Sequence, residues 1–282
     1  MKNINKLFLS LFLFASLFLL TNCDEINEPY REDSQADNGG TEIQKILLED
    51  FTGFRCNNCP AAHDLAHALK EQYGDRLVIL AIHAGFYAEP NPQYIYDFRT
   101  AEGTEINNYF GVQAYPSGML NRTPYNGKAV LGSAYWSAAI NALKDNNPKA
   151  KIDLKPNFNS ASNDVSIDVD ITYLEQSSAS HYLVIQVAED SVVQVQLDKR
   201  KSPELVSDYV HNSILRRTIT GTWGEQVSNS PVAAGTTVTK HFNCSVPQNS
   251  DWRPEMLKII AYIQDKDNAW QIVQVEEAKL VK

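Results

Sequence analysis

The sequence predicts an α/β domain that is followed by an all-β domain. In the first half, apolar runs at residues 46–51 and 77–83 flank a stretch with helical spacing, which gives strand, helix and strand. In the second half, apolar residues occupy every other position, most regularly at residues 165–173. A chain of 282 residues is long enough for two such domains, which we expect at residues 43–147 and 149–282.

Residues 1–23 form a predicted targeting segment. Lys2 and Lys6 precede an almost uninterrupted run of Leu and Phe at residues 7–20, which has the length of the apolar part of a signal peptide. The run leads into Leu-Thr-Asn-Cys, which resembles the lipobox of bacterial lipoproteins and ends at Cys23. The resemblance implies that lipid on Cys23 holds the mature chain on a membrane of the cell envelope. An uncleaved anchor or an ordinary signal peptide is the alternative.

Residues 24–42 contain seven acidic residues, one Arg and few apolar side chains. Such a composition cannot bury a core, so we expect a disordered tether. Asp24 and Glu25 look similar to the acidic residues that act as a surface-export signal in lipoproteins of some Gram-negative lineages. A plain linker is the alternative. The predicted location is the outer membrane, with the protein facing either the periplasm or the cell surface.

The composition also restricts the partners. A net charge of −9 without a basic patch argues against nucleic acid. Four cysteines are too few for a disulfide-rich scaffold, although disulfides persist outside the cytoplasm. We expect Cys244, which shares a strand face with Phe242, to be a buried and unreactive thiol, with a disulfide across the domains as the alternative. The sequence indicates no cofactor.

The first domain is organised around residues 46–60. A buried strand leads into a turn and then into a helix, which we expect to open at Cys56 with Cys59 one turn later. Two cysteines with this spacing after a strand are typical of a redox pair. The helix dipole and its free N–H groups favour the thiolate of Cys56, and Cys59 is close enough to form a disulfide with it.

The remaining elements of this domain follow from local patterns. Pro60 fits a first helical turn, and Gly74 fits a helix end. The apolar run at 77–83 is typical of a parallel strand that is covered on both faces, and it completes a right-handed strand–helix–strand unit. Further elements are predicted as helical pieces at 94–99 and 104–110, short strands after Pro116 and at 128–131, and a helix at 133–144.

Together these features resemble a thioredoxin-fold domain. The acid-bearing strand, the C-N-N-C helix start, the second buried strand and the segment G-V-Q-A-Y-P occur in the order of that fold. The resemblance implies a cis peptide bond before Pro116, with Tyr115 and Ser117 beside it where an extended protein substrate binds. It also implies a buried carboxylate at Asp50, six residues before Cys56.

The resemblance gives these residues roles in thiol–disulfide exchange. Cys56 is the nucleophile, Cys59 resolves the mixed disulfide, and a buried Asp50 with a raised pKa accepts the proton of Cys59. A solvated Asp50 and a structural disulfide are the alternatives. The chain departs from the family at Arg55, a candidate activator of Cys56 where the family has Trp, and at residues 85–108, which look like an insertion.

A rival chemistry is metal binding by Cys56, Cys59, His63 and His67, because two thiolates and two imidazoles suit zinc or copper. Ligands spread over two turns of one helix rarely converge on one ion, so we expect no metal. In that case His63 and His67 are partly exposed helix residues. His83 is expected to be hydrogen-bonded at the end of a buried strand.

The second domain consists of short predicted strands without helices between them. The segments with period-two alternation are 165–173, 182–187, 191–197, 213–219, 237–246, 256–264 and 270–275. About seven antiparallel strands of this kind predict a β-sandwich of immunoglobulin-like type.

The segment 208–225 is polar and aromatic and contains His211, Arg216 and Trp223. It resembles a signature segment of the outer membrane protein 28-related family, and the opening L-L-E-D-F-T-G-x-x-C-x-x-C-P at residues 47–60 matches that family too. The resemblance implies an envelope lipoprotein with a thioredoxin-like and then a β-rich domain, without defining its chemistry. We expect His211 and Trp223 to pack at a strand end against the neighbouring domain.

Two functions are compatible with these predictions. The first is a thiol–disulfide oxidoreductase that is anchored at the outer membrane and acts on protein cysteines. The second is a non-enzymatic binding or adhesion lipoprotein in which Cys56 and Cys59 form a stabilising disulfide. The reducibility of that disulfide distinguishes the two functions, because an exchange site requires an accessible and reducible bond.

Overall fold

A computed structural model describes residues 42–281 of the chain. The predicted signal peptide, Cys23 and all of the predicted tether except Glu42 lie outside the described residues. Among the residues that the structure describes, no helix is both long and apolar enough to cross a membrane.

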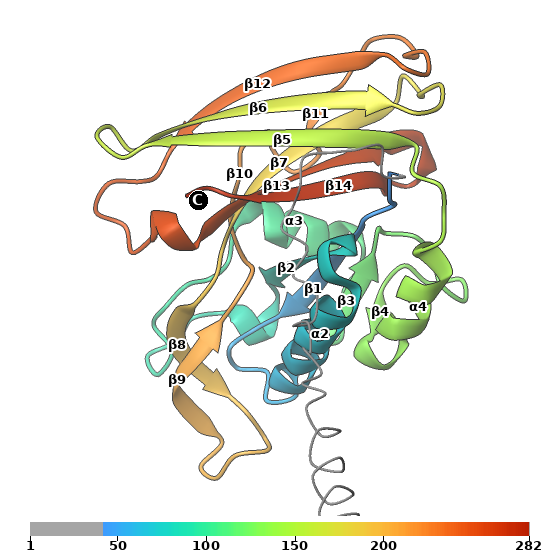
Figure 1. Ribbon diagram of the computed structural model, residues 1–282. Helices are drawn as coiled ribbons and strands as arrows, with labels where there is room; N and C mark the ends of the chain where they lie inside the picture. The colour runs from blue at the N-terminus through green and yellow to red at the C-terminus, as the bar shows by residue number, and fades with distance from the viewer. Residues whose placement is uncertain (1–41, 282) are drawn as a thin grey trace, which may run out of the picture. The chain divides into compact units, whose positions relative to one another are not determined.

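Strands β1 (Ile46–Thr52) and β2 (Leu77–His83) run parallel inside a nine-stranded sheet of the described chain (Figure 1). Every residue of β1 is buried, as expected for a strand that is covered on both faces. β3 (Ser117–Leu120) pairs with the other side of β1 in the antiparallel direction, and β4 (Leu131–Gly132) follows β3 at the sheet edge.

Three helices cover the two faces of this part of the sheet. Ile46 and Leu48 pack with α2 (Cys59–Tyr73) and α4 (Trp136–Leu143). Leu47 packs on the opposite face with α3 (Ala101–Tyr109). Because side chains alternate along a strand, Asp50 belongs to the same face as Ile46 and Leu48, which is the face covered by α2.

The second half of the chain adds two layers of strands (Figure 1). One layer is a three-stranded sheet in the order β12-β6-β5, and the other continues the nine-stranded sheet in the order β14-β13-β7-β10, with β11 also paired to β7. Apolar residues from both layers form one core cluster between them. The strands are β5 (Ala150–Asn159), β6 (Asp164–Tyr173), β7 (His181–Glu189), β10 (Ile214–Thr218), β11 (Glu225–Gln226), β12 (Thr237–Ser245), β13 (Leu257–Asp265) and β14 (Gln271–Lys279).

One parallel pairing joins the two halves of the chain. β10 lies beside β2 with Ile214 opposite Ala81, and the Ala81 amide donates to the Ser213 carbonyl at 2.7 Å. A single sheet therefore contains strands from both sides of the predicted boundary at residue 148. Whether residues 43–147 and 149–282 fold as separate domains stays a prediction.

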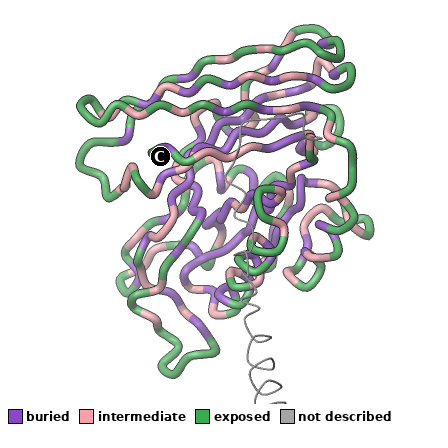
Figure 2. Tube along the Cα trace, viewed as in Figure 1, coloured by how far each residue is buried: buried purple, intermediate pink, exposed green. Residues whose placement is uncertain are grey.

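A two-stranded hairpin leaves the two layers. β8 (Val192–Leu197) and β9 (Leu205–His211) pair only with each other among the described strands, and Figure 1 shows them extending away from the sheets. Figure 2 shows an exposed tip on this hairpin and buried residues along the central strands. The sequence predicted β8 as a strand of the sandwich, but it instead belongs to this hairpin.

One further prediction is wrong, and two strands were missed. Residues 94–99 are irregular rather than helical, because Tyr94 and Phe98 turn inward to pack around Phe54 while two prolines precede them. β5 and β9 were not predicted. β5 contains Pro156, which is tolerated because β5 is the edge strand of its sheet.

Candidate functional site

The cysteine pair lies in the turn between β1 and α2. Cys56 and Cys59 form a disulfide, with 5.4 Å between their Cα atoms. The prediction that the helix opens at Cys56 is wrong, because α2 begins at Cys59. Two successive turns precede it, closed by bonds from the Cys56 amide to the Gly53 carbonyl (2.9 Å) and from the Cys59 amide to the Cys56 carbonyl (3.2 Å). Pro60, which lacks an N–H, then occupies the first helical turn.

The turn is fixed against residues 86–89. The Arg55 amide donates to the Tyr87 carbonyl at 3.1 Å, and a Cβ on Gly53 would lie 2.5 Å from that carbonyl group. The guanidinium of Arg55 stacks over the Phe86 ring at 4.4 Å and donates to the Phe86 and Glu89 carbonyls. The guanidinium of Arg55, a candidate activator of Cys56, thus contacts the loop at residues 86–89.

Asp50 is the acidic group of the site. Asp50 is only 1% exposed, and burial raises the pKa of its carboxyl from 3.8 to about 7. Oδ1 has no hydrogen-bond partner among the described residues, and Oδ2 lies 3.8 Å from Nε2 of His63. The alternative of a solvated Asp50 is therefore wrong.

His63 connects Asp50 to the hairpin. Its Nε2 lies 2.8 Å from Oγ1 of Thr52, and its Nδ1 lies 2.8 Å from the hydroxyl of Tyr209 in β9. Burial lowers the pKa of His63 to about 4, so the ring is neutral at neutral pH. The sequence placed His63 on α2, but it gave no sign of Tyr209, which is 146 residues away.

The hairpin closes over the cysteine turn. The Leu197 amide donates to the Phe54 carbonyl at 2.9 Å, and the Lys199 amide donates to the Asn57 carbonyl at 3.0 Å. The side chain of Gln196 donates to the Cys56 carbonyl at 3.0 Å. Under this cover Cys56 is 2% exposed and Cys59 is 0% exposed.

Polar side chains extend the contact between the hairpin and α2. Arg200, just after β8, forms an ion pair with Asp64 of α2 at 2.6 Å. Asn57 donates to Glu204 at 3.3 Å. Phe54 is buried among side chains of the hairpin and of the loop before α3. The hairpin therefore holds the turn by backbone, polar and apolar contacts at once.

The three predicted substrate-binding residues lie beside the end of β1. The peptide bond between Tyr115 and Pro116 is cis, the geometry that the resemblance implies. Ser117 opens β3 opposite Phe51, and its hydroxyl donates to the Ala114 carbonyl at 2.7 Å. The Tyr115 hydroxyl donates to Asn107 at 2.5 Å, which fixes its ring against α3. Because Ser117 pairs with Phe51, which follows Asp50 in β1, the three residues lie close to the strand position of Asp50.

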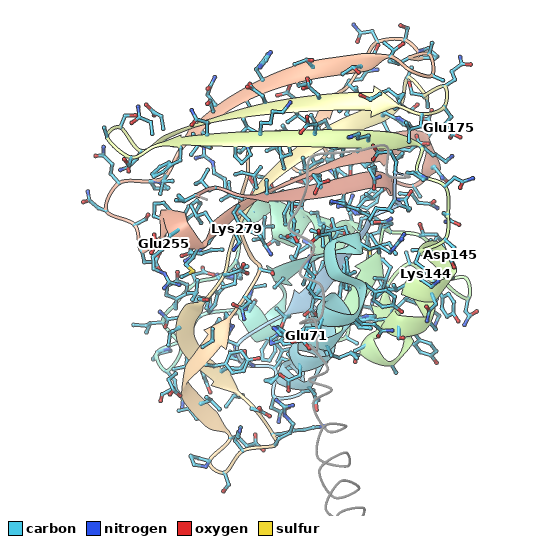
Figure 3. All side chains as sticks on the ribbon, in the orientation of Figure 1. Glu71, Lys144, Asp145, Glu175, Glu255 and Lys279 are labelled. Atoms are coloured by element: carbon cyan, nitrogen blue, oxygen red, sulfur yellow. A yellow bond between two sulfur atoms is a disulfide. The ribbon has the colours of Figure 1, made fainter. Side chains whose placement is uncertain are left out.

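A cavity of about 860 Å³ opens behind Asp50. The residues that line it come mainly from α2, β2 and the segments 190–191, 209–213, 255–258 and 277–279. Asp50, His63, His83 and Tyr209 all contribute to its lining. Glu255 and Lys279, which also line the cavity, are labelled in Figure 3. The acid of the site therefore has a cavity beside it, to which both polar and apolar side chains contribute.

His83 differs from its predicted surroundings, whereas His211 lies at the end of β9 and packs on Phe98 of the first half of the chain, as expected. His83 is buried, but neither of its ring nitrogens has a hydrogen-bond partner among the described residues, so the predicted hydrogen bond is absent there. Its ring stacks on Phe98 at 4.4 Å and lies 5.6 Å from His211. Burial lowers the pKa of both histidines, that of His211 to about 3. Trp223 lies elsewhere, in contact with Tyr109 and Trp270.

The rival metal ligands do not converge. Cys56 and Cys59 are bonded to each other, and His63 is held by two hydroxyl groups. The His67 side chain is 70% exposed and lies 3.4 Å from Glu71. Among residues 42–281, no group of three or more His, Cys, Asp or Glu side chains is arranged to hold a metal ion. Cys244 is a free thiol that is half-buried, rather than fully buried as predicted.

Comparison with known proteins gives a family. A family with the description "Outer membrane protein Omp28" matches residues 104–282. The match begins after the cysteine turn, so it covers the hairpin and the two layers of strands but neither Cys56 nor Cys59. No curated protein sequence matches the chain.

Solved structures share the mostly β-sheet fold with some helices. HBP35 of Porphyromonas gingivalis has a TM-score of 0.66 at 14% identity, and the match covers 86% of this chain and 77% of that one. Protein AGR_C_4864 from Agrobacterium tumefaciens has a TM-score of 0.55 at 15% identity, with 86% and 96% covered. At such low identity the likeness shows the fold alone.

Proposed function

This chain belongs to the family of outer membrane protein Omp28, which indicates an outer-membrane or envelope location, and we propose that it is a thiol–disulfide oxidoreductase held there by lipid on Cys23. In this proposal residues 43–147 form a thioredoxin-like domain and residues 149–282 form an immunoglobulin-like sandwich. The parallel β1–α2–β2 unit with antiparallel β3 and β4 supports the first assignment. The shared core between two layers of strands supports the second.

The observation that carries the proposal is the disulfide at the start of α2 together with the buried carboxyl of Asp50 on the strand beneath that helix. A helix N-terminus lowers the pKa of a nearby thiol, which favours Cys56 as the nucleophile. A carboxyl with a pKa of about 7 can accept a thiol proton and return it near neutral pH.

The exchange reaction balances as follows in the reducing direction. The Cys56 thiolate attacks a substrate disulfide, which forms a mixed disulfide and releases the first substrate thiolate. Cys59 then gives its proton to the Asp50 carboxylate and attacks the sulfur of Cys56. The Cys56–Cys59 disulfide forms, the second substrate thiolate leaves, and two electrons have passed to the substrate. Oxidation of a substrate dithiol is the reverse sequence.

Access to Cys56 requires movement of the hairpin, because the residue is only 2% exposed. In the proposal a protein substrate binds in extended form beside Tyr115, Pro116 and Ser117 once β8 has left the turn. The polar hairpin contacts are hydrogen bonds and one half-exposed ion pair, each worth about 1 kcal/mol. Opening also separates side chains of β8 from Phe54, so the open state is a minor population.

A second function is favoured by one specific observation. Cys56 and Cys59 are both buried, and the hairpin bonds directly to the backbone on either side of Cys56. Such cover is also what a structural disulfide requires. In this case the protein is a non-enzymatic binding or adhesion lipoprotein, and the disulfide stabilises the turn that holds the hairpin.

The reduction potential of the Cys56–Cys59 pair separates the two functions. A chain with Cys23→Ser is equilibrated in graded glutathione buffers, and alkylated thiols are quantified by mass spectrometry. A potential between about −120 and −270 mV is expected for an exchange catalyst. A potential below about −300 mV, with no mixed disulfide trapped in a Cys59→Ser variant, would leave the structural disulfide as the function of this pair.

A further inference from the structure

Asp50 lacks a close partner for its charged form. A buried carboxylate is stable only when hydrogen-bond donors or cations replace its lost hydration. Oδ2 lies 3.8 Å from Nε2 of His63, and Oδ1 has no hydrogen-bond partner among the described residues. The imidazole of His63 is therefore the group that can stabilise the charged form of Asp50.

The His63 ring is held by two hydroxyl groups. The Tyr209 hydroxyl lies 2.8 Å from Nδ1, and the Thr52 hydroxyl lies 2.8 Å from Nε2. A neutral imidazole carries one N–H, and the hydroxyl groups can act as donor or acceptor. When Tyr209 donates to Nδ1, the N–H of His63 is at Nε2, where the Thr52 hydroxyl accepts from it at 2.8 Å and the Asp50 carboxylate lies 3.8 Å away.

The other titratable and charged groups around Asp50 lie farther along the same network. β2 provides His83, α2 provides Asp64, and β9 provides Tyr209 and His211. The hairpin also provides Asp198 and Arg200. The charge of Asp198 raises the pKa values of His63 and Tyr209, and the charge of Arg200 lowers them. None of these groups is an ion-pair partner of Asp50, whereas His63 is within 4 Å. Asp50 and His63 also line the same cavity, which gives their protons a route to solvent.

We propose that His63 is a positioning residue whose Nε2–H, oriented by Tyr209 of the β8–β9 hairpin, stabilises the Asp50 carboxylate during proton transfer from Cys59. This inference rests on the proposed exchange function and deepens it. The hairpin then has two roles: β8 covers the disulfide, and Tyr209 of β9 orients His63. In the proposed exchange only β8 leaves the turn, and Tyr209 of β9 stays bonded to His63 through the resolving step.

The test measures the titration of Asp50 directly. Carbon-13 carboxyl NMR is recorded from pH 4 to 10 on the Cys23→Ser chain with its disulfide intact. His63→Leu removes the donor, so the Asp50 midpoint is expected to rise by about one pH unit, a tenfold gain in proton affinity. His63→Gln retains an N–H donor and is expected to shift the midpoint less. Tyr209→Phe, which keeps the ring but loses the orienting hydroxyl, is expected to shift it in the same direction as His63→Leu.

His67→Gln is the matched control, because His67 is on the same helix with its side chain 70% exposed. An unchanged Asp50 midpoint in both His63→Leu and Tyr209→Phe, with folding confirmed by circular dichroism, overturns the inference. The pH dependence of the Cys59 resolving step is then measured in the same variants, and its midpoint is expected to move with that of Asp50. If the Asp50 midpoint shifts while the wild-type chain shows no exchange, the interaction of His63 with Asp50 stands, but the proposed function and the part of His63 in proton transfer both fail.

Discussion

Glu49 and Asp50 are adjacent in β1 and both are buried, but their surroundings differ. Glu49 accepts two bonds from the Arg122 guanidinium, at 2.6 and 2.8 Å, and Arg122 also donates to Gln264 and Tyr262. Asp50 faces the other side of the sheet, where its Oδ2 lies 3.8 Å from Nε2 of His63. One carboxyl is therefore fixed in an ion pair, while the other is free to exchange a proton.

The raised pKa of Asp50 predicts a loss of stability with increasing pH. The folded state holds the proton up to about pH 7, whereas the unfolded state releases it near pH 3.8, so the folded state binds more protons between these values. The free energy of unfolding therefore falls as pH rises from 4 to 7. Asp50→Asn removes this dependence and is expected to be more stable than wild type at pH 8 by up to about 4 kcal/mol.

Urea unfolding of Asp50→Asn and wild type at pH 4 and pH 8 checks this prediction. Asp164→Asn, at an exposed position of β6, is the control. Equal stability differences at the two pH values would show that the carboxyl of Asp50 is not held protonated by its surroundings.

Removal of one partner of the Glu49–Arg122 pair is expected to be severe. Both side chains are fully buried, so Arg122→Met leaves the Glu49 carboxylate unpaired and is expected to cost about 3–5 kcal/mol in urea unfolding. The double variant Glu49→Leu, Arg122→Met is expected to recover part of this loss. Arg99→Ala breaks an ion pair with Asp97 at the surface and is expected to cost less than about 1 kcal/mol. Similar losses for Arg122→Met and Arg99→Ala would contradict the argument.

At the scale of elements, the β8–β9 hairpin decides whether solvent reaches the disulfide. Gln196→Ala removes the side-chain bonds from β8 to the turn, at the Cys56 carbonyl (3.0 Å) and the Gly53 carbonyl (3.4 Å). Each lost hydrogen bond is worth about 1 kcal/mol, so the open population is expected to increase roughly 30-fold. Reduction of the disulfide by dithiothreitol, followed by alkylation of Cys56, is therefore expected to be faster in Gln196→Ala. Lys155→Ala on exposed β5 is the control, and an unchanged reduction rate in Gln196→Ala argues against gating by the hairpin.

Local patterns predicted most elements but not their partners. All seven predicted strands of the second half are present, because each carries its own period-two alternation. β5 was missed although its residues alternate between apolar and polar, because Pro156 argues against a strand. β9 was missed because its residues are mostly exposed. Cys56 was predicted to open α2, but the helix starts at Cys59 because backbone turns close the preceding residues.

At the scale of the whole molecule, the continuous sheet predicts cooperative unfolding. One core cluster contains Val78 and Leu80 from the first half together with Tyr262 and Val275 from the second. Loss of either half exposes this shared core, so urea unfolding followed by fluorescence and by circular dichroism is expected to give one coincident transition. Two separate transitions would instead support independent domains at residues 43–147 and 149–282.

The predicted anchor is tested on whole cells. Lipid on Cys23 is expected to keep the chain in the membrane fraction, and Cys23→Ser is expected to release it into the soluble fraction. Cys244→Ser is the matched control, because Cys244 is a free thiol in β12. Retention of Cys23→Ser in the membrane fraction would show that another segment holds the protein there.

The sequence by itself determined the cysteine pair, the acid six residues before it, the strand–helix–strand unit and the alternating strands that follow. These features depend on spacing within one segment, where the chain geometry limits the choices. Only the tertiary structure decided that β10 joins β2, that the hairpin covers Cys56, and that Tyr209 holds His63 beside Asp50. Such contacts join residues up to 146 positions apart, and no local period records which distant segments will pack together.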